Sequence, residues 1–323
     1  MKNLISFLTI SIFLISCEKS NENATPLQVS FNEQILDGYH VISIAFDRHG
    51  NAWIGTLNQG LIKYNTNETI VYNSENSVVS DAPIWDIAVD SKNNVWIGCE
   101  GLIKYDGTEF TYFNSKNTPI PEDNIYSIAI DSKDNVWFSS CRFQQGGLVK
   151  YDGINWTVYI PDNSELPYNL INGIAIDKND NVWLSFFSCL ARISGDKWKI
   201  YTSDDLGFEP YDIVDIQVND QNKLCGAINY SHSSMFIDGP QVFIFDDVST
   251  KQLKNDNLLT TNFITVDNQD NIWCGILGGF AVYNGQEWTV DNSSFKEVSV
   301  FAIEQSNDNK IWIGTGNGIR ISD

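Results

Sequence analysis

The chain has 323 residues with 20 Lys and Arg against 41 Asp and Glu, a formal net charge of −21. This charge argues against nucleic acid and against an anionic membrane surface as partners, because both are bound by basic side chains. Hydrophobic residues make up 42% and aromatic residues 13% of the chain, which is enough for a sizeable core, so only a short N-terminal stretch is expected to lack a fold.

The N-terminus has the pattern of a sorting signal. An apolar run from Leu4 to Ile15 follows a lysine and is shorter than a membrane-spanning helix, with the length of a signal-peptide core. The sequence Leu-Ile-Ser-Cys that ends at Cys17 resembles a bacterial lipobox. This resemblance implies cleavage before Cys17, acylation of its thiol and anchoring in a lipid bilayer through several acyl chains. An ordinary secretory signal with a chance cysteine is the alternative.

The next segment is polar and has no apolar periodicity, so it is expected to be a flexible tether. A Glu rather than an Asp follows Cys17, which favours the outer membrane of the bacterial envelope over the inner one. We therefore expect a lipoprotein signal peptide over residues 1–16, the tether over residues 17–26 and one folded domain over residues 27–323.

One phrase recurs seven times along this domain. It has apolar residues around a small one, an Asp, a polar turn and then Asn-x-Trp, as in DIAVDSKNNVWIG at residues 86–98. Successive copies of the tryptophan position are 43, 41, 46, 42, 48 and 39 residues apart. These positions are Trp53, Trp96, Trp137, Trp183, Cys225, Trp273 and Trp312. A period in the forties with strand patterning is typical of propeller blades.

Each copy holds four short strand signals: the Ile-Ala-Val run, the tryptophan segment, a Gly-Leu-Ile-Lys-Tyr segment and an alternating aromatic segment. No stretch has a sustained helical period, so helix should be nearly absent. The predicted fold class is an all-β, seven-bladed β-propeller closed by an N-terminal strand. The last copy ends at residues 318–323 without a fourth strand signal, and we expect Leu27 to Asn32 to supply that strand.

The recurring polar residues predict hairpin turns. The leading Asp of each turn is expected to accept backbone N–H groups, and a residue with positive φ is expected at Gly50, Asn93, Asp134, Asp180 and Asp270. A calcium loop is the alternative, but the acidic alternation of such a loop is missing. The tryptophans are expected to fill the wedges between blades, with the small residue two places later leaving room for the indole.

The cysteines after Cys17 are odd in number, so at least one thiol should stay free within the chain. They are Cys99, Cys141, Cys189, Cys225 and Cys274. One neighbouring pair among the first three could form a disulfide, and buried free thiols are expected for the last two.

The phrase Asp-x-x-Gly/Asp-Asn-x-Trp-Ile-Gly-Thr, followed by Gly-Leu-x-Lys-Tyr-Asp-Gly, resembles the two-component regulator propeller repeat over about residues 40–323. Such propellers form the periplasmic sensors of bacterial hybrid histidine kinases, and others stand alone as lipoproteins. The resemblance implies a sensor-like propeller of the stand-alone lipoprotein form, because no kinase, receiver or transmembrane segment is expected here. The family has no fixed catalytic residues, so no catalytic residue, cofactor or metal is predicted.

A ligand is expected on the propeller face where the loops between second and third strands and the segments between blades emerge. The candidate binding residues there are aromatic or acidic, with one arginine and one histidine: Trp85, Glu100, Asp123, Tyr126, Arg142, Tyr168, Phe186, Tyr211 and His232. Aromatic platforms beside carboxylates suit a carbohydrate or a cationic peptide. The alternative is that these aromatic rings plug the channel.

Three functions are left open by the sequence. The first is a non-catalytic, envelope-anchored lipoprotein that binds a ligand or a partner on this face. The second is a metal-dependent lyase, because the Asn-x-Trp-Phe repeats also resemble streptogramin lyase, a propeller that uses histidine and a divalent metal, and His40 and His232 are predicted to reach the same face. The third is an assembly protein that docks onto an envelope protein.

Overall fold

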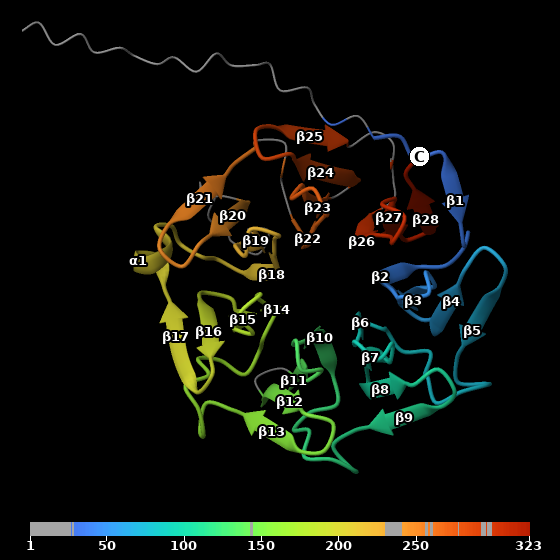
Figure 1. Cartoon of the computed structure of the whole chain (residues 1–323), viewed down its shortest axis with the longest axis horizontal. Helices are drawn as coiled ribbons and strands as arrows, with labels where there is room; N and C mark the ends of the chain where they lie inside the picture. The colour runs from blue at the N-terminus through green and yellow to red at the C-terminus, as the bar shows by residue number, and fades with distance from the viewer. Residues whose placement is uncertain are drawn as a thin grey trace, which may run out of the picture.

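A computed structural model describes residues 27, 29–142, 145–229, 241–255, 258, 261–276, 278–291, 295 and 299–323. Seven four-stranded antiparallel sheets stand around a central axis as blades, so the predicted seven-bladed β-propeller is confirmed (Figure 1). The described part contains one short helix, α1 (Ser203–Leu206). The predicted signal peptide, Cys17 and the tether lie outside the described residues.

The blades follow one another along the chain, and each places its first strand at the axis and its fourth at the rim (Figure 1). Blades one to three are β2 (Val41–Phe46), β3 (Ala52–Thr56), β4 (Leu61–Tyr64) and β5 (Thr69–Tyr72); β6 (Asp86–Val89), β7 (Val95–Cys99), β8 (Gly101–Tyr105) and β9 (Phe110–Phe113); and β10 (Ile125–Ile130), β11 (Val136–Arg142), β12 (Gln145–Tyr151) and β13 (Trp156–Tyr159). Blades four and five are β14 (Gly173–Ile176), β15 (Val182–Ser185), β16 (Leu190–Ser194) and β17 (Lys197–Tyr201); and β18 (Ile213–Val218), β19 (Leu224–Ile228), β20 (Val242–Phe245) and β21 (Thr250–Leu253). Blades six and seven are β22 (Phe263–Val266), β23 (Ile272–Ile276), β24 (Gly279–Tyr283) and β25 (Trp288–Asp291); and β26 (Val300–Gln305), β27 (Ile311–Thr315), β28 (Gly318–Ile321) and β1 (Glu33–Ile35).

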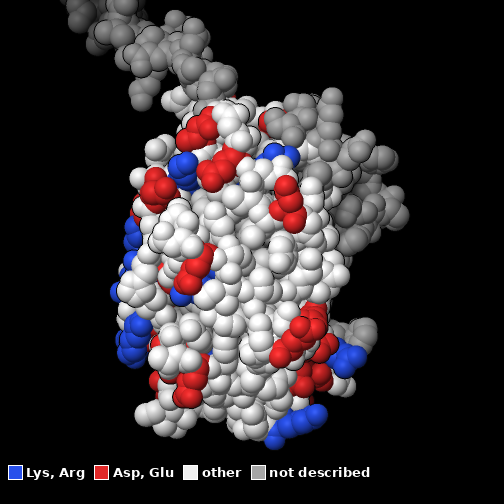
Figure 2. Space-filling view, turned by 90° about the vertical axis from the view of Figure 1, so that its right-hand side faces the viewer, with Lys and Arg blue, Asp and Glu red and all other residues white. Residues whose placement is uncertain are grey.

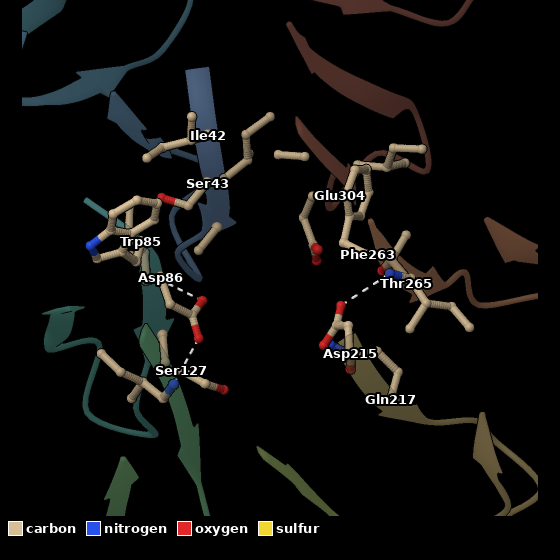
Figure 3. Close-up of a pocket in the computed structure, with 18 of the residues that line it drawn as sticks. Ile42, Ser43, Trp85, Asp86, Ser127, Asp215, Gln217, Phe263, Thr265 and Glu304 are labelled. Carbon is tan, nitrogen blue, oxygen red and sulfur yellow. Dashed lines mark hydrogen bonds between the residues drawn. The ribbon is translucent and has the colours of Figure 1, made fainter. Parts of the chain in front are cut away.

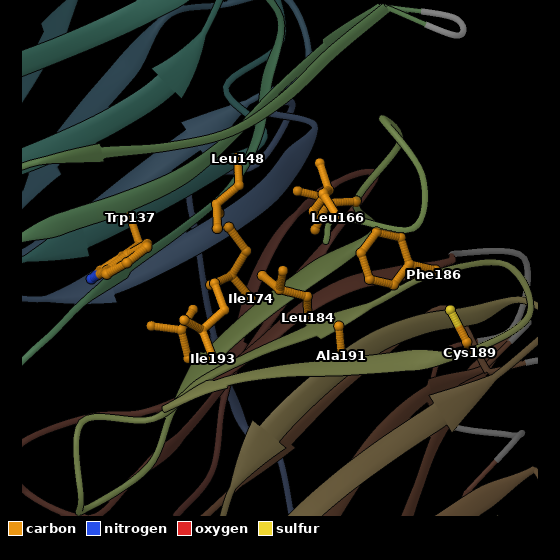
Figure 4. Close-up of a cluster of buried hydrophobic side chains, with 11 residues drawn as sticks. Trp137, Leu148, Leu166, Ile174, Leu184, Phe186, Cys189, Ala191 and Ile193 are labelled. Atoms are coloured by element: carbon orange, nitrogen blue, oxygen red, sulfur yellow. The ribbon is translucent and has the colours of Figure 1, made fainter. Parts of the chain in front are cut away.

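The hydrophobic core lies in layers between adjacent blades. Figure 4 shows one layer, in which Trp137 of β11 packs with Ile174 and Leu184 of the next blade. The marker tryptophans are all buried, and the predicted role in packing between blades is confirmed. A large flat ring fills a wedge that narrows toward the axis with few side chains.

The Asp before each turn links the turn to the tryptophan layer. Asp131 accepts the backbone N–H groups of Lys133 at 3.0 Å and Asn135 at 2.9 Å, and the Asn135 side-chain amide at 2.7 Å. Its other oxygen also accepts the indole N–H of Trp137 at 3.1 Å. The five predicted positive-φ positions all have positive φ, so the turn assignment is confirmed.

The small residue two places after Trp96 has a different role from the one expected. A Cβ built on Gly98 would lie 2.9 Å from the backbone oxygen of Ile125 and 3.0 Å from its Cγ2. Ile125 begins the first strand of the next blade, so Gly98 admits the neighbouring chain rather than the indole of its own blade.

The turns between first and second strands form a closed ring on the face opposite the loops. The Ser91 backbone N–H, for example, donates to Asp134 of the next blade at 2.9 Å. The other junctions are Arg48 to Asn93, Ser132 to Asp180, Lys178 to Asn222, Asp220 to Asp270, Asn268 to Gln305 and, closing the ring, Asn307 to Asp47. We call this face the turn face.

The N-terminal segment closes the propeller, but with a different strand from the predicted one. Strand β1 pairs antiparallel with β28 at the position of the fourth strand (Figure 1). It begins at Glu33, directly after the predicted segment Leu27 to Asn32. Leu27, Val29 and Phe31 pack instead against the layer between blades six and seven. The alternating apolar pattern of this segment therefore marks buried side chains, whereas strand pairing needs only the backbone.

No disulfide joins the described cysteines, and the five thiols after Cys17 are free and buried. The free thiols predicted for Cys225 and Cys274 are confirmed, and the bridge considered among the first three is not formed. Burial raises the pKa of the Cys99 thiol to about 12, which keeps this group protonated and unreactive.

Candidate functional site

An axial channel of about 520 Å³ runs between the first strands of the blades. The loop segments that carry Trp85 and Tyr126 open onto one end of it, and we call this side the loop face. The volume lies within the range of small-molecule sites. Everything that reaches the channel wall comes from a first strand or from the segment just before it.

The repeat determines which side chains line this wall. The residue paired with the small second-strand residue is Ser43, Asp86, Ser127, Gly173, Asp215, Phe263 or Ala302 in the successive blades. The residue paired with the tryptophan position is Ala45, Ala88, Ala129, Ala175, Gln217, Thr265 or Glu304. Most of these side chains are small or uncharged, so the three acidic ones are departures from the pattern.

Asp86 and Asp215 each link their own blade to the next. Asp86 accepts the N–H groups of Ile87 at 2.8 Å and Ile128 at 2.7 Å. Asp215 accepts those of Ile216 at 2.8 Å and Ile264 at 3.0 Å. Burial raises the pKa of both carboxyl groups to about 7, although the backbone hydrogen bonds act in the opposite direction.

Glu304 extends from β26 into the same space, and Figure 3 shows the three carboxyl groups pointing into the channel from different walls. Among the described residues, none donates a hydrogen bond to the Glu304 carboxylate. Burial raises the pKa of Glu304 to about 8, and the nearby Asp86 adds to the rise. The side chain is partly buried and lines the channel.

The channel differs in charge from the outside of the molecule. Figure 2 shows one side of the rim, where acidic and basic side chains are interspersed among uncharged ones. The described residues that line the channel include three carboxyl groups and no Lys, Arg or His. The channel therefore gathers acidic groups without a basic side chain among its described lining residues.

Aromatic rings surround the end of the channel at the loop face. The Trp85 ring lies 5.5 Å from the Tyr126 ring, and its side chain is unusually accessible for a tryptophan, at 41% exposure. On the opposite side Phe301 lines the channel and its ring lies 4.6 Å from the His40 ring. The predicted pair Trp85 and Tyr126 is thus brought together, with Phe301 as an unpredicted third ring.

The other predicted residues lie apart from the channel. Tyr168 is exposed and its hydroxyl lies 3.2 Å from that of Ser188, while the Tyr211 ring contacts Phe187 at 4.6 Å. These rings form a second aromatic group at blades four and five. Glu100 and Arg142 are exposed, Asp123 accepts the Ser115 N–H at 2.7 Å, and none of the three lines the channel.

The remaining two predicted residues are Phe186 and His232. Phe186 is completely buried in the core layer of blade four, so the prediction that it meets a ligand is corrected. Successive side chains at the end of a strand point to opposite sides, so only one of the two adjacent phenylalanines is buried. The exposed one is Phe187, at 49%. His232 lies outside the described residues.

Within the described ranges, no group of three or more His, Cys, Asp or Glu side chains is arranged to hold a metal ion. Among those residues, no helix has the length and apolar character needed to cross a membrane.

Comparison with known proteins confirms the repeat type. The family model described as "two component regulator propeller" matches residues 79–101 and 119–142, in blades two and three and the segments before them. No curated protein matches the chain in sequence. The repeats of this chain are therefore of the kind that the sequence resemblance indicated.

Solved structures with the same fold include bacterial extracellular domains and a lyase. The extracellular domain of BT3049, assigned to a hybrid two component system of B. thetaiotaomicron, is 19% identical with a TM-score of 0.72, covering 93% of this chain and 41% of that one. The corresponding domain of BT4673, assigned to a one component system of the same organism, is 16% identical with a TM-score of 0.67, covering 92% and 40%. Streptogramin B lyase is 15% identical with a TM-score of 0.70, covering 92% and 97%.

These likenesses establish the fold. This chain spans about two fifths of the length of the two extracellular domains, at 41% and 40%. The described chain is a seven-bladed propeller that resembles the sensor domains of two-component-like systems.

Proposed function

We propose that this chain is a non-catalytic, sensor-like propeller, held at the bacterial cell envelope by acylated Cys17, that binds a ligand or a partner protein on its loop face. The observation that carries the proposal is the contact between the exposed Trp85 and the partly buried Tyr126 at the end of an axial channel of about 520 Å³. Exposed aromatic rings beside a concave site are costly to leave in water and are typical of recognition surfaces.

The fold likeness supports this proposal. The extracellular domains of the two B. thetaiotaomicron proteins share the propeller, and a location outside the cytoplasm agrees with the lipobox and the apolar signal core of this chain. The five buried cysteines would be shielded from oxidation there without forming disulfides.

Ligand binding is tested with a glycan array and a peptide library, followed by thermal shift measurements on each binder. A loop-face ligand should stabilise the parent protein, and Trp85→Ala should remove most of that shift. The matched control is Ile154→Ala, because Ile154 is an exposed apolar residue on the turn face, at 83% exposure. Binders that stabilise Trp85→Ala as well as the parent would refute a loop-face site.

Anchoring is tested separately by labelling cells with a radioactive fatty acid. Cys17 should carry the label and partition with the outer membrane, whereas Cys17→Ser should remain uncleaved or unlabelled. A labelled Cys17→Ser protein would show that the lipobox interpretation is wrong.

A metal-dependent lyase is the second candidate, favoured by the likeness to streptogramin B lyase over nearly the whole of that chain. It requires histidine and a divalent metal at the loop face, where His40 lies beside Phe301. A melting shift on adding Mg²⁺ that disappears in His232→Ala would support this candidate, and an identical shift in that variant would count against it.

A further inference from the structure

We propose that the axial channel binds a small aliphatic polyamine, whose separate ammonium groups pair with Asp86, Asp215 and Glu304. The inference rests on the proposed function, since it names the chemical class of ligand for the loop-face site. It is argued from the channel wall alone.

The channel wall carries acidic side chains without basic partners among the described lining residues. The carboxyl groups come from blades two, five and seven and point into one shared space (Figure 3). No basic side chain lies among the described residues that line it. Two carboxyl groups have backbone donors, whereas the partly buried Glu304 has no donor among the described residues, so its ionised form lacks a partner from the protein. A bound cation would supply the missing donor.

The second step is the separation of the charges. Among the described residues, no group of three acidic side chains is arranged around one metal-ion position, so the three carboxyl groups of the channel present their charge at separate points. A ligand that satisfies them must carry its positive charges at separate points. Ala88, Val214 and Phe263 line the wall between the acids, and methylene spacers would pack against these apolar surfaces.

The third step is the entrance. Trp85, Tyr126 and Phe301 line the channel at the loop face, so an ammonium group entering from that side meets the faces of aromatic rings before it meets a carboxylate. Aromatic rings attract desolvated cations. The same residues therefore provide both a path and selectivity for a cationic ligand.

The titratable groups that line the channel are Asp86, Asp215, Glu304 and Tyr126. The three carboxyl groups hold protons up to pH values near 7 or 8, and a bound polyamine favours their ionised forms. Binding should therefore release protons and strengthen as the pH rises from 6 to 7.5, while the amines stay protonated.

The test is calorimetry of spermidine against the detergent-solubilised full chain at physiological salt. We expect saturable binding with proton release, and Glu304→Gln should weaken it by at least about tenfold because the substitution keeps the shape and removes the charge. The matched control is Glu109→Gln, which removes one exposed charge from a turn-face hairpin and should bind as the parent does.

Three outcomes would overturn the inference: no binding at millimolar spermidine, equal weakening in Glu304→Gln and Glu109→Gln, or displacement of spermidine by an equal concentration of Mg²⁺. A ligand found in the screens that depends on Trp85 while spermidine does not bind would sink the polyamine and leave the proposed function standing.

Discussion

Ser306 provides a sharp test of how the turn Asp stabilises the propeller. It stands in blade seven at the position that Asp131 has in blade three, and its hydroxyl donates to Asp308 at 2.5 Å and to the Lys310 carbonyl at 3.0 Å. As a result the indole N–H of Trp312 is buried without any acceptor, unlike that of Trp137. Ser306→Asp should place a carboxylate oxygen where this N–H can reach it.

The size of the gain follows from the complete copies. A hydrogen bond to a charged acceptor is worth about 1.5–3 kcal/mol and also removes the cost of the unsatisfied N–H. Repulsion from Asp308 and the partial burial of the new charge oppose it. Burial also raises the pKa of Asp47 in blade one, yet the bonds from Asn51 and Trp53 leave it below its usual value, so this environment favours the ionised form. We expect a net gain of about 1–2 kcal/mol and a Tm rise of roughly 2–5 °C.

The assay is differential scanning calorimetry of four proteins at pH 7. Ser306→Asp should melt above the parent, and Ser306→Asn, whose amide oxygen is uncharged, should gain less. The mirror substitution Asp131→Ser should melt below the parent, because it leaves the Trp137 N–H without its acceptor. If Ser306→Asp melts at or below the parent while Asp131→Ser is neutral, the account of the turn Asp as an indole acceptor is wrong.

Three further predictions concern the channel, the closure and the blade contact. The pKa values of Asp86, Asp215 and Glu304 are raised in the folded protein, so these groups keep protons that the unfolded chain releases near pH 4. The stability that these protonated groups contribute is therefore complete below about pH 4 and is lost as the pH rises through 7 to 8. Glu304→Gln should therefore raise the Tm relative to the parent at pH 8.5 and change it little at pH 4; equal differences at both pH values would contradict this. Deleting residues 27–35 should lower the Tm sharply, because β28 loses its partner and Phe31 leaves its contacts with Phe280 and Phe295, whereas Phe31→Ala alone should cost about 2–3 kcal/mol in chemical unfolding. Gly98→Ala should destabilise by more than about 1 kcal/mol in the same assay, because its Cβ meets backbone of the next blade, while Gly107→Ala has open space and is limited by its positive φ alone.

The repeat predicted the fold because its period and its strand signals reflect contacts that each blade makes in the same way. The residues that bury Trp137 stand at positions equivalent to those that bury Trp53 and Trp96, so one interpretation applies to these copies. The closing strand was placed a few residues early because Leu27, Val29 and Phe31 alternate like a strand, while β1 pairs through a backbone whose side chains carry little pattern. A sequence pattern reports side-chain burial and only indirectly reports hydrogen bonding.

The candidate site was predicted only in part. The sequence placed Trp85 and Tyr126 at the loop face, and they line the end of the channel there, whereas the adjacent Phe186 and Phe187 differ only in strand alternation and the buried one was predicted to be accessible. The acids of the channel were missed because each lies inside a strand signal that looks ordinary by itself. Aligning the copies by their tryptophans would have shown Glu304 where the first four copies carry alanine.

This contrast explains why function in such a ring resides in the exceptions to its repeat. Positions that hold the blades together are alike in most copies, since a difference there opens a wedge or removes a hydrogen bond. The channel wall is less constrained, because its side chains line an open space, although Asp86 and Asp215 also bond to the next blade. These two acids and Glu304 therefore place titratable groups in the channel without opening a wedge, and the pH dependence of stability and of spermidine binding should change together when Glu304 is neutralised. If neutralising Glu304 changes the stability profile but leaves spermidine binding intact, the acids are tolerated departures from the repeat rather than a binding site.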